Sequence, residues 1–210
     1  MTETQAVAVR SATRADVKPL AAALARAFYE DPPLVWMMPN PDTRLPRITS
    51  VFTTVVGIQA LRHGGVDVAC VGGEIVAGAI WLPPGHWQPG LREQIRAVPA
   101  HAWALRPRLG RSFRLGRAME NAHPKEPHWY LEAIGVDPPW QSRGVASLLL
   151  RSRLEQSDQD RQPAYLEAGK PELVPLYEHF GFRRTGTLNL PRGAPVITPM
   201  WRPSAAPGAG

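Results

Sequence analysis

The chain has 210 residues, of which 44% are hydrophobic and 8% aromatic, and its formal net charge is +6. This length and composition are typical of one globular α/β domain, and the longest apolar runs are too short to cross a bilayer. The first ten residues lack the basic start and apolar stretch of a secretory signal. Cys70 is the only cysteine, so no intrachain disulfide can form. We expect a cytoplasmic protein with neither a membrane partner nor a bound metal ion.

Positive charge is concentrated in the segment 91–117, where seven arginines are opposed by Glu93 alone. An arginine surplus favours anionic partners in general. The segment could be a solvated helical face, a subunit interface, or a lid that faces a phosphate-bearing cofactor. Nucleic acid is the least favoured partner, because the interleaved aromatic pattern of an RNA-binding sheet is missing.

The predicted elements alternate between strands and helices. The first are a strand at 6–11 and a helix that Thr13 or Asp16 can cap, which runs to about residue 29 and is stopped by Asp31-Pro32-Pro33. A loop at 39–42, a helix at 48–62 and a hairpin with strands at 66–71 and 74–82 follow. Then come two or three short helices within 86–122 interrupted at Pro99 and Pro107, a strand at 128–136, a helix at 145–156, a strand at 164–168, a helix at 172–180, and a strand pair at 182–190 and 196–201.

This order predicts a mixed α/β fold, with a central mixed sheet of about six or seven strands flanked by helices on both faces. We expect one domain over residues 1–201 with a helical excursion at about 86–122. A small, Pro- and Gly-rich segment at 202–210 is predicted to be a flexible tail.

The most informative segment joins a strand ending at Val136 to a helix that begins beside Gly144. The first amides of a helix are unpaired and lie at the positive end of its dipole, which suits a pyrophosphate. Gly144 permits the close approach of an anion, and Arg143 and Ser147 could add direct contacts. The same arrangement is also found in ordinary strand-to-helix turns, so this segment alone does not decide the function.

The residues of this segment also resemble a family motif. Gln141-x-x-Gly144-x-Ala146 is similar to the acyl-CoA pyrophosphate loop of GNAT-superfamily N-acetyltransferases. About 36 residues after Gln141, the segment 175–182 resembles the Leu-Tyr-x-x-x-Gly-Phe element of that family, and 165–168 resembles its fifth strand. Residues 123–127 and the strand after them resemble the puromycin-type branch. The likeness covers nearly all of residues 7–201.

The resemblance implies that the strands at 128–136 and 164–168 run parallel, splay apart and hold acetyl-CoA in the gap. It implies transfer of an acetyl group from acetyl-CoA to a primary amine of a small molecule by direct attack. The expected cofactor contacts are Ile134 and Val136 for the pantetheine arm, and Gln141, Ser142, Arg143, Gly144, Val145, Ala146 and Ser147 for the pyrophosphate.

Direct attack needs a neutral amine, so a general base must first remove a proton. Glu132 and Glu167 are the candidates, and alternation places Glu132 on the same strand face as Tyr130, Ile134 and Val136. We favour Glu132 because the family often uses a carboxylate on that strand. Puromycin-type sequences instead keep the carboxylate that matches Glu167, so both remain candidates.

Tyr177 matches the family tyrosine that protonates the leaving thiolate of coenzyme A, and we expect it to be the general acid. His123 and His128 are weaker candidates for proton transfer. Relatives often carry an asparagine shortly before the tyrosine, and this chain has Lys170 or Leu173 there instead.

The acceptor pocket of such enzymes is built by the first helices and the insertion. We expect Phe28, Tyr29, Asp31, Trp36 and Trp81 to line it, which would suit a hydrophobic cationic amine. A tryptophan at such spacing is also common in cores. The alternative functions are a non-catalytic acyl-CoA sensor and an acetyltransferase that acts on a protein or RNA-linked amine. A monomer or a homodimer is expected.

Overall fold

A seven-stranded sheet runs through the computed structural model, which describes residues 6–191 and 193–204. The strands are β1 (Ala8–Ser11), β2 (Val66–Val71), β3 (Glu74–Leu82), β4 (Trp129–Val136), β5 (Ala164–Ala168), β6 (Arg183–Arg184) and β7 (Thr198–Arg202). Their order is β1-β2-β3-β4-β5-β7-β6, and β4 and β5 are the parallel pair in a sheet whose other neighbours are antiparallel. The predicted fold class is confirmed.

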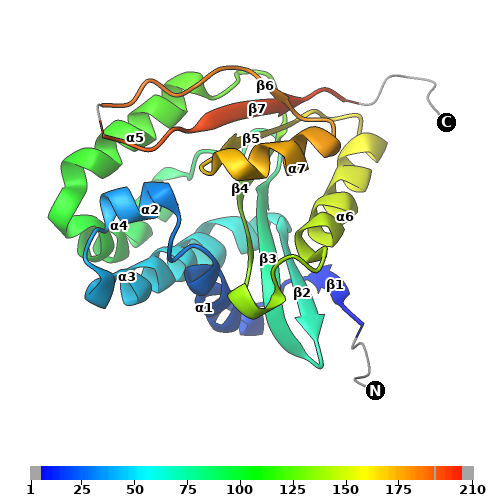
Figure 1. The fold of residues 1–210 in the computed structure, drawn as a ribbon, viewed down its shortest axis with the longest axis horizontal. Coiled ribbons are helices and arrows are strands. Elements are labelled where there is room, and N and C mark those ends of the chain that lie inside the picture. The colour runs from blue at the N-terminus through cyan, green and yellow to red at the C-terminus, as the bar shows by residue number, and fades with distance from the viewer. Residues whose placement is uncertain (1–5, 192, 205–210) are drawn as a thin grey trace.

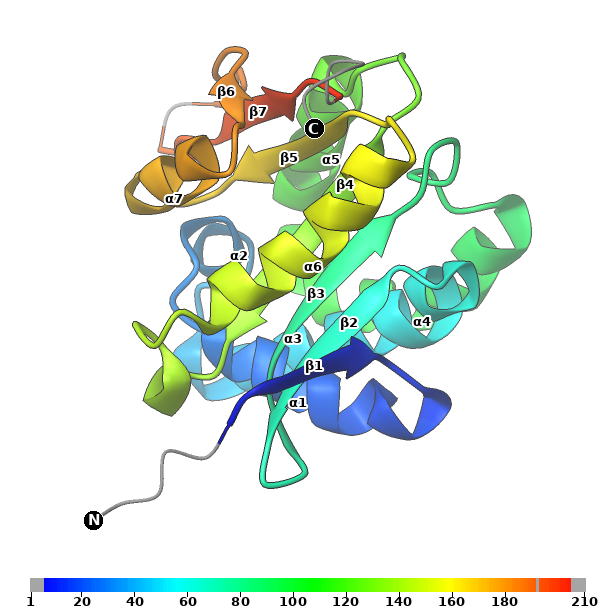
Figure 2. The same cartoon turned by 90° about the vertical axis from the view of Figure 1, so that its right-hand side faces the viewer.

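Helices cover both faces of the sheet, as Figures 1 and 2 show. They are α1 (Val17–Ala27), α2 (Pro32–Met37), α3 (Pro41–Thr54), α4 (Leu91–Leu105), α5 (Leu109–Ala122), α6 (Val145–Gln159) and α7 (Val174–His179). In Figure 2, α6 crosses the face nearer the viewer, whereas α1 and α3 lie behind the sheet.

Each face has its own hydrophobic core. On the face of α1 and α3, fully buried Leu20, Leu24 and Ile48 pack with strand residues such as Ile80 and Tyr165. On the face of α6, fully buried Leu149 and Leu150 pack with residues such as Trp81, Leu166 and Met200. The close approach of α1 depends on Gly135, because a Cβ there would lie 2.9 Å from side-chain atoms of Leu24 and Phe28.

The first helix ends before Pro32, as predicted, but two helix starts at prolines were not predicted. Helix α1 ends at Ala27, α2 then begins at Pro32, and α3 begins at Pro41, within the predicted loop. Proline at the first turn of a helix costs little, because the amide that it lacks would have no helical partner there. The Asn40 side chain accepts a hydrogen bond from the Asp42 amide at 3.0 Å and caps α3, which passes into a π-helical segment, Val55–Ala60.

The later elements are closer to prediction. Helices α4 and α5 occupy the predicted excursion, with a break at Pro107 but an uninterrupted helix through Pro99. Only Arg183–Arg184 of the predicted strand at 182–190 forms regular strand structure. The chain stays beside β7, since the Thr185 amide donates to the Pro199 carbonyl and the Leu188 amide to the Ile197 carbonyl, but Pro199 has no amide to donate in return, so the ladder is irregular there. Of the predicted tail, Arg202 belongs to β7, and residues 205–210 lie outside the described part of the chain.

Candidate active site

The parallel strands β4 and β5 separate partway along their length. They pair from Trp129 with Ala164 to Leu131 with Leu166 and no further. Beyond that point β4 continues to Val136 beside β3, while β5 continues to Ala168 beside β7. The predicted splay is therefore present, and it leaves the β5-facing backbone of residues 132–136 without a strand partner.

A β-bulge at Glu132 redirects the side chains of β4. Ile80 of β3 pairs with Ala133 and Trp81 pairs with Leu131, so Glu132 is an extra residue in the ladder. Tyr130 and Ala133 consequently face α1 and α3, whereas Ile134 and Val136 face α6. The prediction that Glu132 shares a face with Ile134 and Val136 was wrong, because simple alternation does not hold across a bulge.

The loop before α6 is exposed and carries unusual backbone angles. Gly144 caps the helix with φ of 77°, and Ser142 also has a positive φ of 60°. The Gln141 side-chain amide donates to the Val136 carbonyl at 3.0 Å, which ties the loop to the end of β4. The Arg143 guanidinium lies over the Trp140 ring at 4.9 Å. These contacts fix the loop in front of α6, whose first amides have no partner within the helix, and unpaired amides at a helix start are what an anion requires.

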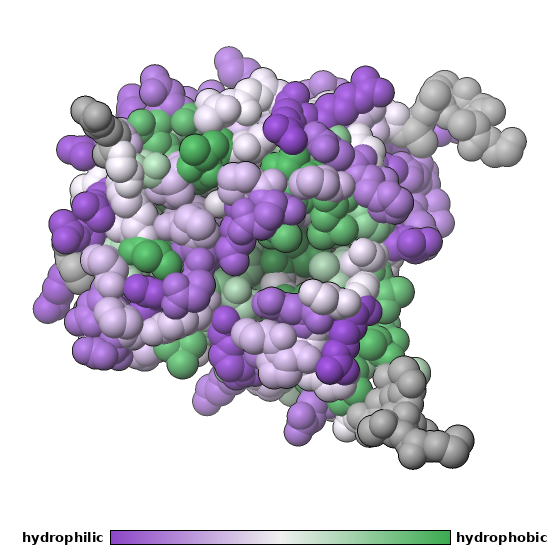
Figure 3. Space-filling view, viewed as in Figure 1, coloured by the Kyte–Doolittle hydropathy of each residue, from purple (hydrophilic) through white to green (hydrophobic). Residues whose placement is uncertain are grey.

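The predicted cofactor residues have different exposures in this arrangement. Gln141, Ser142, Arg143 and Gly144 are exposed, and Ala146 and Ser147 are half-buried. The Val145 side chain is buried in the core, so this residue could offer a ligand only its backbone. Figure 3 shows an apolar hollow in the surface where β4 passes between α7 and the loop before α6.

A cavity of about 300 Å³ lies on the α1 and α3 side of the splay. Its polar members are Asp31, Tyr130, Glu132 and Glu167, and its remaining wall is mainly apolar, with contributions from α2, α3 and α5 such as Met37, Phe52 and Leu115. No lysine or arginine is found among the described residues that line it. The cavity is therefore an apolar chamber with acidic groups on its sheet side.

The two glutamates in this cavity are buried. Burial raises the pKa of Glu132 to about 7, with a further rise from the charge of Glu167. Burial also raises the pKa of Glu167 to about 7, and the nearby hydroxyls of Tyr130 and Tyr165 oppose part of that rise. Oε2 of Glu132 and Oε1 of Glu167 have no hydrogen-bond partner among the described residues. Both carboxylates can therefore exchange a proton near neutral pH.

Asp31 and Tyr177 are close enough to interact electrostatically. Asp31 precedes α2, and burial raises its pKa to about 6 despite the opposing charge of Lys170. Tyr177 on α7 is buried against Phe182, with ring centroids 6.2 Å apart. Burial and then the charge of Asp31 raise the pKa of Tyr177, so its hydroxyl is protonated at neutral pH.

Two of the five predicted acceptor residues, Phe28 and Asp31, line the cavity. The other three do not, which corrects the prediction. Trp81 is fully buried in the core under α6, the Tyr29 hydroxyl donates to the Pro41 carbonyl, and Trp36 packs beneath the Arg111 guanidinium. The bulge on β4 and the unpredicted helix α2 account for much of this difference. Apolar spacing alone does not distinguish a residue that lines a cavity from one in the core.

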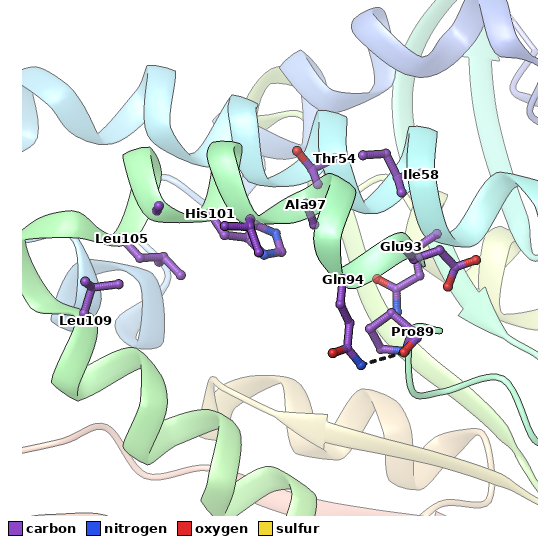
Figure 4. Close-up of a pocket in the computed structure, with 12 residues that line it drawn as sticks. Thr54, Ile58, Pro89, Glu93, Gln94, Ala97, His101, Leu105 and Leu109 are labelled. Carbon is purple, nitrogen blue, oxygen red and sulfur yellow. Dashed lines mark hydrogen bonds between the residues drawn. The ribbon is translucent and has the colours of Figure 1, made fainter. Parts of the chain in front are cut away.

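A second cavity of about 380 Å³ lies between α4 and the end of α3 (Figure 4). Its acidic group, Glu93, forms an ion pair with Arg62 and accepts a hydrogen bond from the Gly90 amide at 2.8 Å. The Gln94 side chain donates to the Pro89 carbonyl, also at 2.8 Å. Glu93 and Gln94 therefore already have partners. His101 also lines this cavity, but the two buried carboxylate oxygens without a partner among the described residues lie in the first cavity.

Within residues 6–191 and 193–204, no helix is both long and apolar enough to cross a membrane. The same residues contain no group of three or more histidine, cysteine, aspartate or glutamate side chains that could hold a metal ion.

The comparisons with known proteins agree with this geometry. An uncharacterised N-acetyltransferase of Schizosaccharomyces pombe is 27% identical over 185 residues, which are 80% of this chain and 70% of that protein. A Corynebacterium glutamicum structure described as histone acetyltransferase HPA2 and related acetyltransferase is 28% identical, with a TM-score of 0.76 over 96% of this chain and 98% of that one. Drosophila melanogaster polyamine N-acetyltransferase shares the fold at 17% identity, with a TM-score of 0.66 over 94% of this chain and 100% of that one. The sequence profile of the acetyltransferase (GNAT) family matches residues 22–182. The chain belongs to this family and is an acyltransferase.

Proposed function

We propose that the protein transfers an acetyl group from acetyl-CoA, the acyl donor used by its family, to the primary amine of a small cationic molecule with an apolar body. The observation that carries this proposal is the cavity beside the β4–β5 splay, which combines an apolar wall with Asp31, Glu132 and Glu167. Its acidic groups would attract an ammonium ion, and its wall would bury the rest of the acceptor.

Acetyl-CoA would supply the activated acyl group as a thioester. The exposed amides after Gln141 would hold its pyrophosphate, and Ile134 and Val136 would offer strand backbone to the pantetheine arm. The positive φ of Gly144 and the unpaired edge of β4 support this assignment, because both leave backbone groups free for a ligand. A backbone amide of the same edge would polarise the thioester carbonyl.

The carboxylate pair would prepare the amine for attack. One ionised carboxylate of Glu132 and Glu167 accepts a proton from the ammonium group, and the electron pair of the broken N–H bond stays on nitrogen. A pKa of about 7 makes either group a stronger base than an ordinary glutamate while leaving part of it ionised at neutral pH. Because the groups interact, the first proton is best assigned to the pair.

Tyr177 would complete the reaction by donating its hydroxyl proton to the departing sulfur. Its burial keeps the hydroxyl protonated at neutral pH, and α7, the helix that carries it, borders the hollow over β4 in Figure 3. The pair of buried carboxylates favours catalysis over the alternative of an acyl-CoA sensor, because binding alone would not require two unpartnered acidic oxygens. The cytoplasmic location and the oligomeric state stay predictions.

The test is a mass-spectrometric screen with acetyl-CoA and a panel of amines. The panel contains agmatine, because the Drosophila neighbour forms N-acetylagmatine, arylalkylamines, because an Aedes aegypti neighbour is an arylalkylamine N-acetyltransferase, and puromycin, because residues 123–127 resemble the puromycin-type branch. We expect acetylation of an amine with an apolar body. Tight acetyl-CoA binding in calorimetry without any acetylated amine would favour the sensor and contradict the proposal.

A further inference from the structure

Two histidines form a buried pair next to Glu167. His123 follows α5, and His128 directly precedes β4. Their Nε2 atoms lie 3.0 Å apart, and Nδ1 of His128 lies 2.6 Å from the backbone carbonyl oxygen of Glu126. Nδ1 of His123 lies 3.9 Å from Oε1 of Glu167, and the side chains of His123 and Glu167 are only 2% and 3% exposed. The three side chains thus form a row that leads from the Glu126 carbonyl to the cavity.

The hydrogen bonds of this row fix the tautomer of each ring. The Glu126 carbonyl can only accept, so Nδ1 of His128 must carry its proton. In a neutral ring, Nε2 of His128 is then the acceptor, and Nε2–H of His123 must be the donor. Burial lowers the pKa of both histidines, which keeps both rings neutral. The unprotonated Nδ1 of His123 therefore directs its lone pair at Glu167.

The surroundings hold the His123 ring in this orientation. The ring stacks on Trp87 with centroids 3.7 Å apart and an interplanar angle of 18°. Tyr130 and Tyr165 meet it edge-on at 4.9 and 5.0 Å. A ring fixed on three sides and bonded at Nε2 presents its remaining lone pair in one direction only.

We propose that His128 and His123 are positioning residues that make Glu167, rather than Glu132, the general base of the acetyl transfer described above. The inference rests on the proposed function. After the Glu167 carboxylate takes the amine proton, a half-turn of its carboxyl group points the new O–H bond at Nδ1 of His123. The last torsion of glutamate is broad and roughly two-fold, so this turn is inexpensive. If Oε1 of Glu167 moves about 1 Å closer to Nδ1 of His123, the two atoms form an O–H···N hydrogen bond. Oε1 has no other hydrogen-bond partner among the described residues that would oppose this movement.

A hydrogen bond to the protonated form favours that form, so it strengthens Glu167 as a base. The proton stays on oxygen, and no charge moves onto the histidines. Of the two glutamates, Glu167 is the one with a histidine nitrogen within 4.0 Å among the described residues. The other titratable groups that face Glu167 are Tyr130 and Glu132 from β4, Tyr165 from β5, and Asp31 across the cavity. None of these side chains offers a lone pair held in one orientation, as Nδ1 of His123 does.

Two measurements test the proposal. The first is two-bond ¹H–¹⁵N correlation NMR of the full chain at neutral pH, with peaks assigned by His123→Phe and His128→Phe. We expect His123 protonated at Nε2 and His128 at Nδ1. A proton on Nδ1 of His123 would overturn the proposal without any reference to activity.

The second measurement is the pH profile of kcat/KM for an amine accepted by the wild type. Loss of one net hydrogen bond in His123→Phe should lower kcat/KM about threefold to tenfold near neutral pH and move its acid limb down by about half to one pH unit. The deficit should vanish at alkaline pH, where the amine arrives neutral. His128→Phe should move the acid limb in the same direction, because it frees His123 to turn its proton toward Glu167.

The matched control is His63→Phe, the same replacement at a ring that stacks on His86 and does not line the cavity. This control should keep the wild-type profile. A loss in His123→Phe that is equal at every pH, or an unchanged acid limb in both variants, would show that the pair has only a structural role. If the wild type acetylates no amine, the proposed function fails, and the NMR measurement still reports on the row of hydrogen bonds.

Discussion

Replacing Glu132 with glutamine should stabilise the protein at alkaline pH. Burial raises the pKa of Glu132 from 4.5 to about 7, a rise of about 2.5 units. Each unit corresponds to about 1.4 kcal/mol, so ionising this carboxyl in the folded state costs on the order of 3 kcal/mol. Glutamine has nearly the same shape and carries no charge at any pH, so the variant avoids this cost.

The sign of the effect depends on pH. The folded state holds the proton of Glu132 to a higher pH than the unfolded chain, so the contribution of this residue to stability is most favourable below pH 4.5 and falls as pH rises through 7. Near pH 5, Glu132→Gln should differ little from the wild type. Near pH 9 the full difference of about 3 kcal/mol should appear, which for a chain of this size is an increase in Tm of about 6 to 12 °C.

Urea unfolding and calorimetry at both pH values measure this difference. Glu155→Gln is the control, because Glu155 is exposed on α6 and its replacement should change stability little at either pH. Equal stability of Glu132→Gln and the wild type near pH 9 would refute the reasoning, since it would mean that the carboxylate is solvated in the folded protein.

Two further predictions concern activity, and a third concerns acetyl-CoA binding. Glu167→Gln should lower kcat at least a hundredfold near neutral pH, since it removes the proposed base; activity within threefold of the wild type would exclude Glu167 from that role. Tyr177→Phe should slow turnover at least tenfold, a barrier increase of about 1.4 kcal/mol, while acetyl-CoA affinity in calorimetry stays unchanged. Unchanged turnover would remove Tyr177 from the mechanism. Gly144→Val should weaken acetyl-CoA binding at least tenfold, because φ of 77° is unfavourable for a β-branched residue; wild-type affinity would contradict the pyrophosphate loop, and Gly116→Val on exposed α5 serves as its control.

Much of the cofactor side of the fold could be predicted from local sequence. The hairpin turn at Gly72 and Gly73, the strand Ala164–Ala168 and the start of α6 after Gly144 depend on residues near one another in the chain. Local turn chemistry and apolar spacing therefore carried these predictions.

The acceptor side was harder to predict, because it depends on long-range packing. The bulge at Glu132 arises from the pairing of β4 with β3, and nothing in the sequence of β4 alone indicates it. The row from His128 through His123 to Glu167 joins a loop to β5, 39 residues apart at its ends. The stop predicted before Pro32 is present, but the start of α2 at the same proline was missed, because proline both ends and begins helices.

Because of the bulge, β4 presents one set of side chains to each face of the sheet. Tyr130, Glu132 and Ala133 line the cavity that we propose for the acceptor amine, while Ile134 and Val136 lie on the opposite face. The apolar wall of that cavity comes mainly from helices elsewhere in the chain, including Met37 of α2 and Leu115 of α5. Mutations in α2 and α5 could therefore change which amines bind without altering the loop before α6. Related enzymes could in this way acquire new acceptors while they keep the same cofactor and catalytic groups.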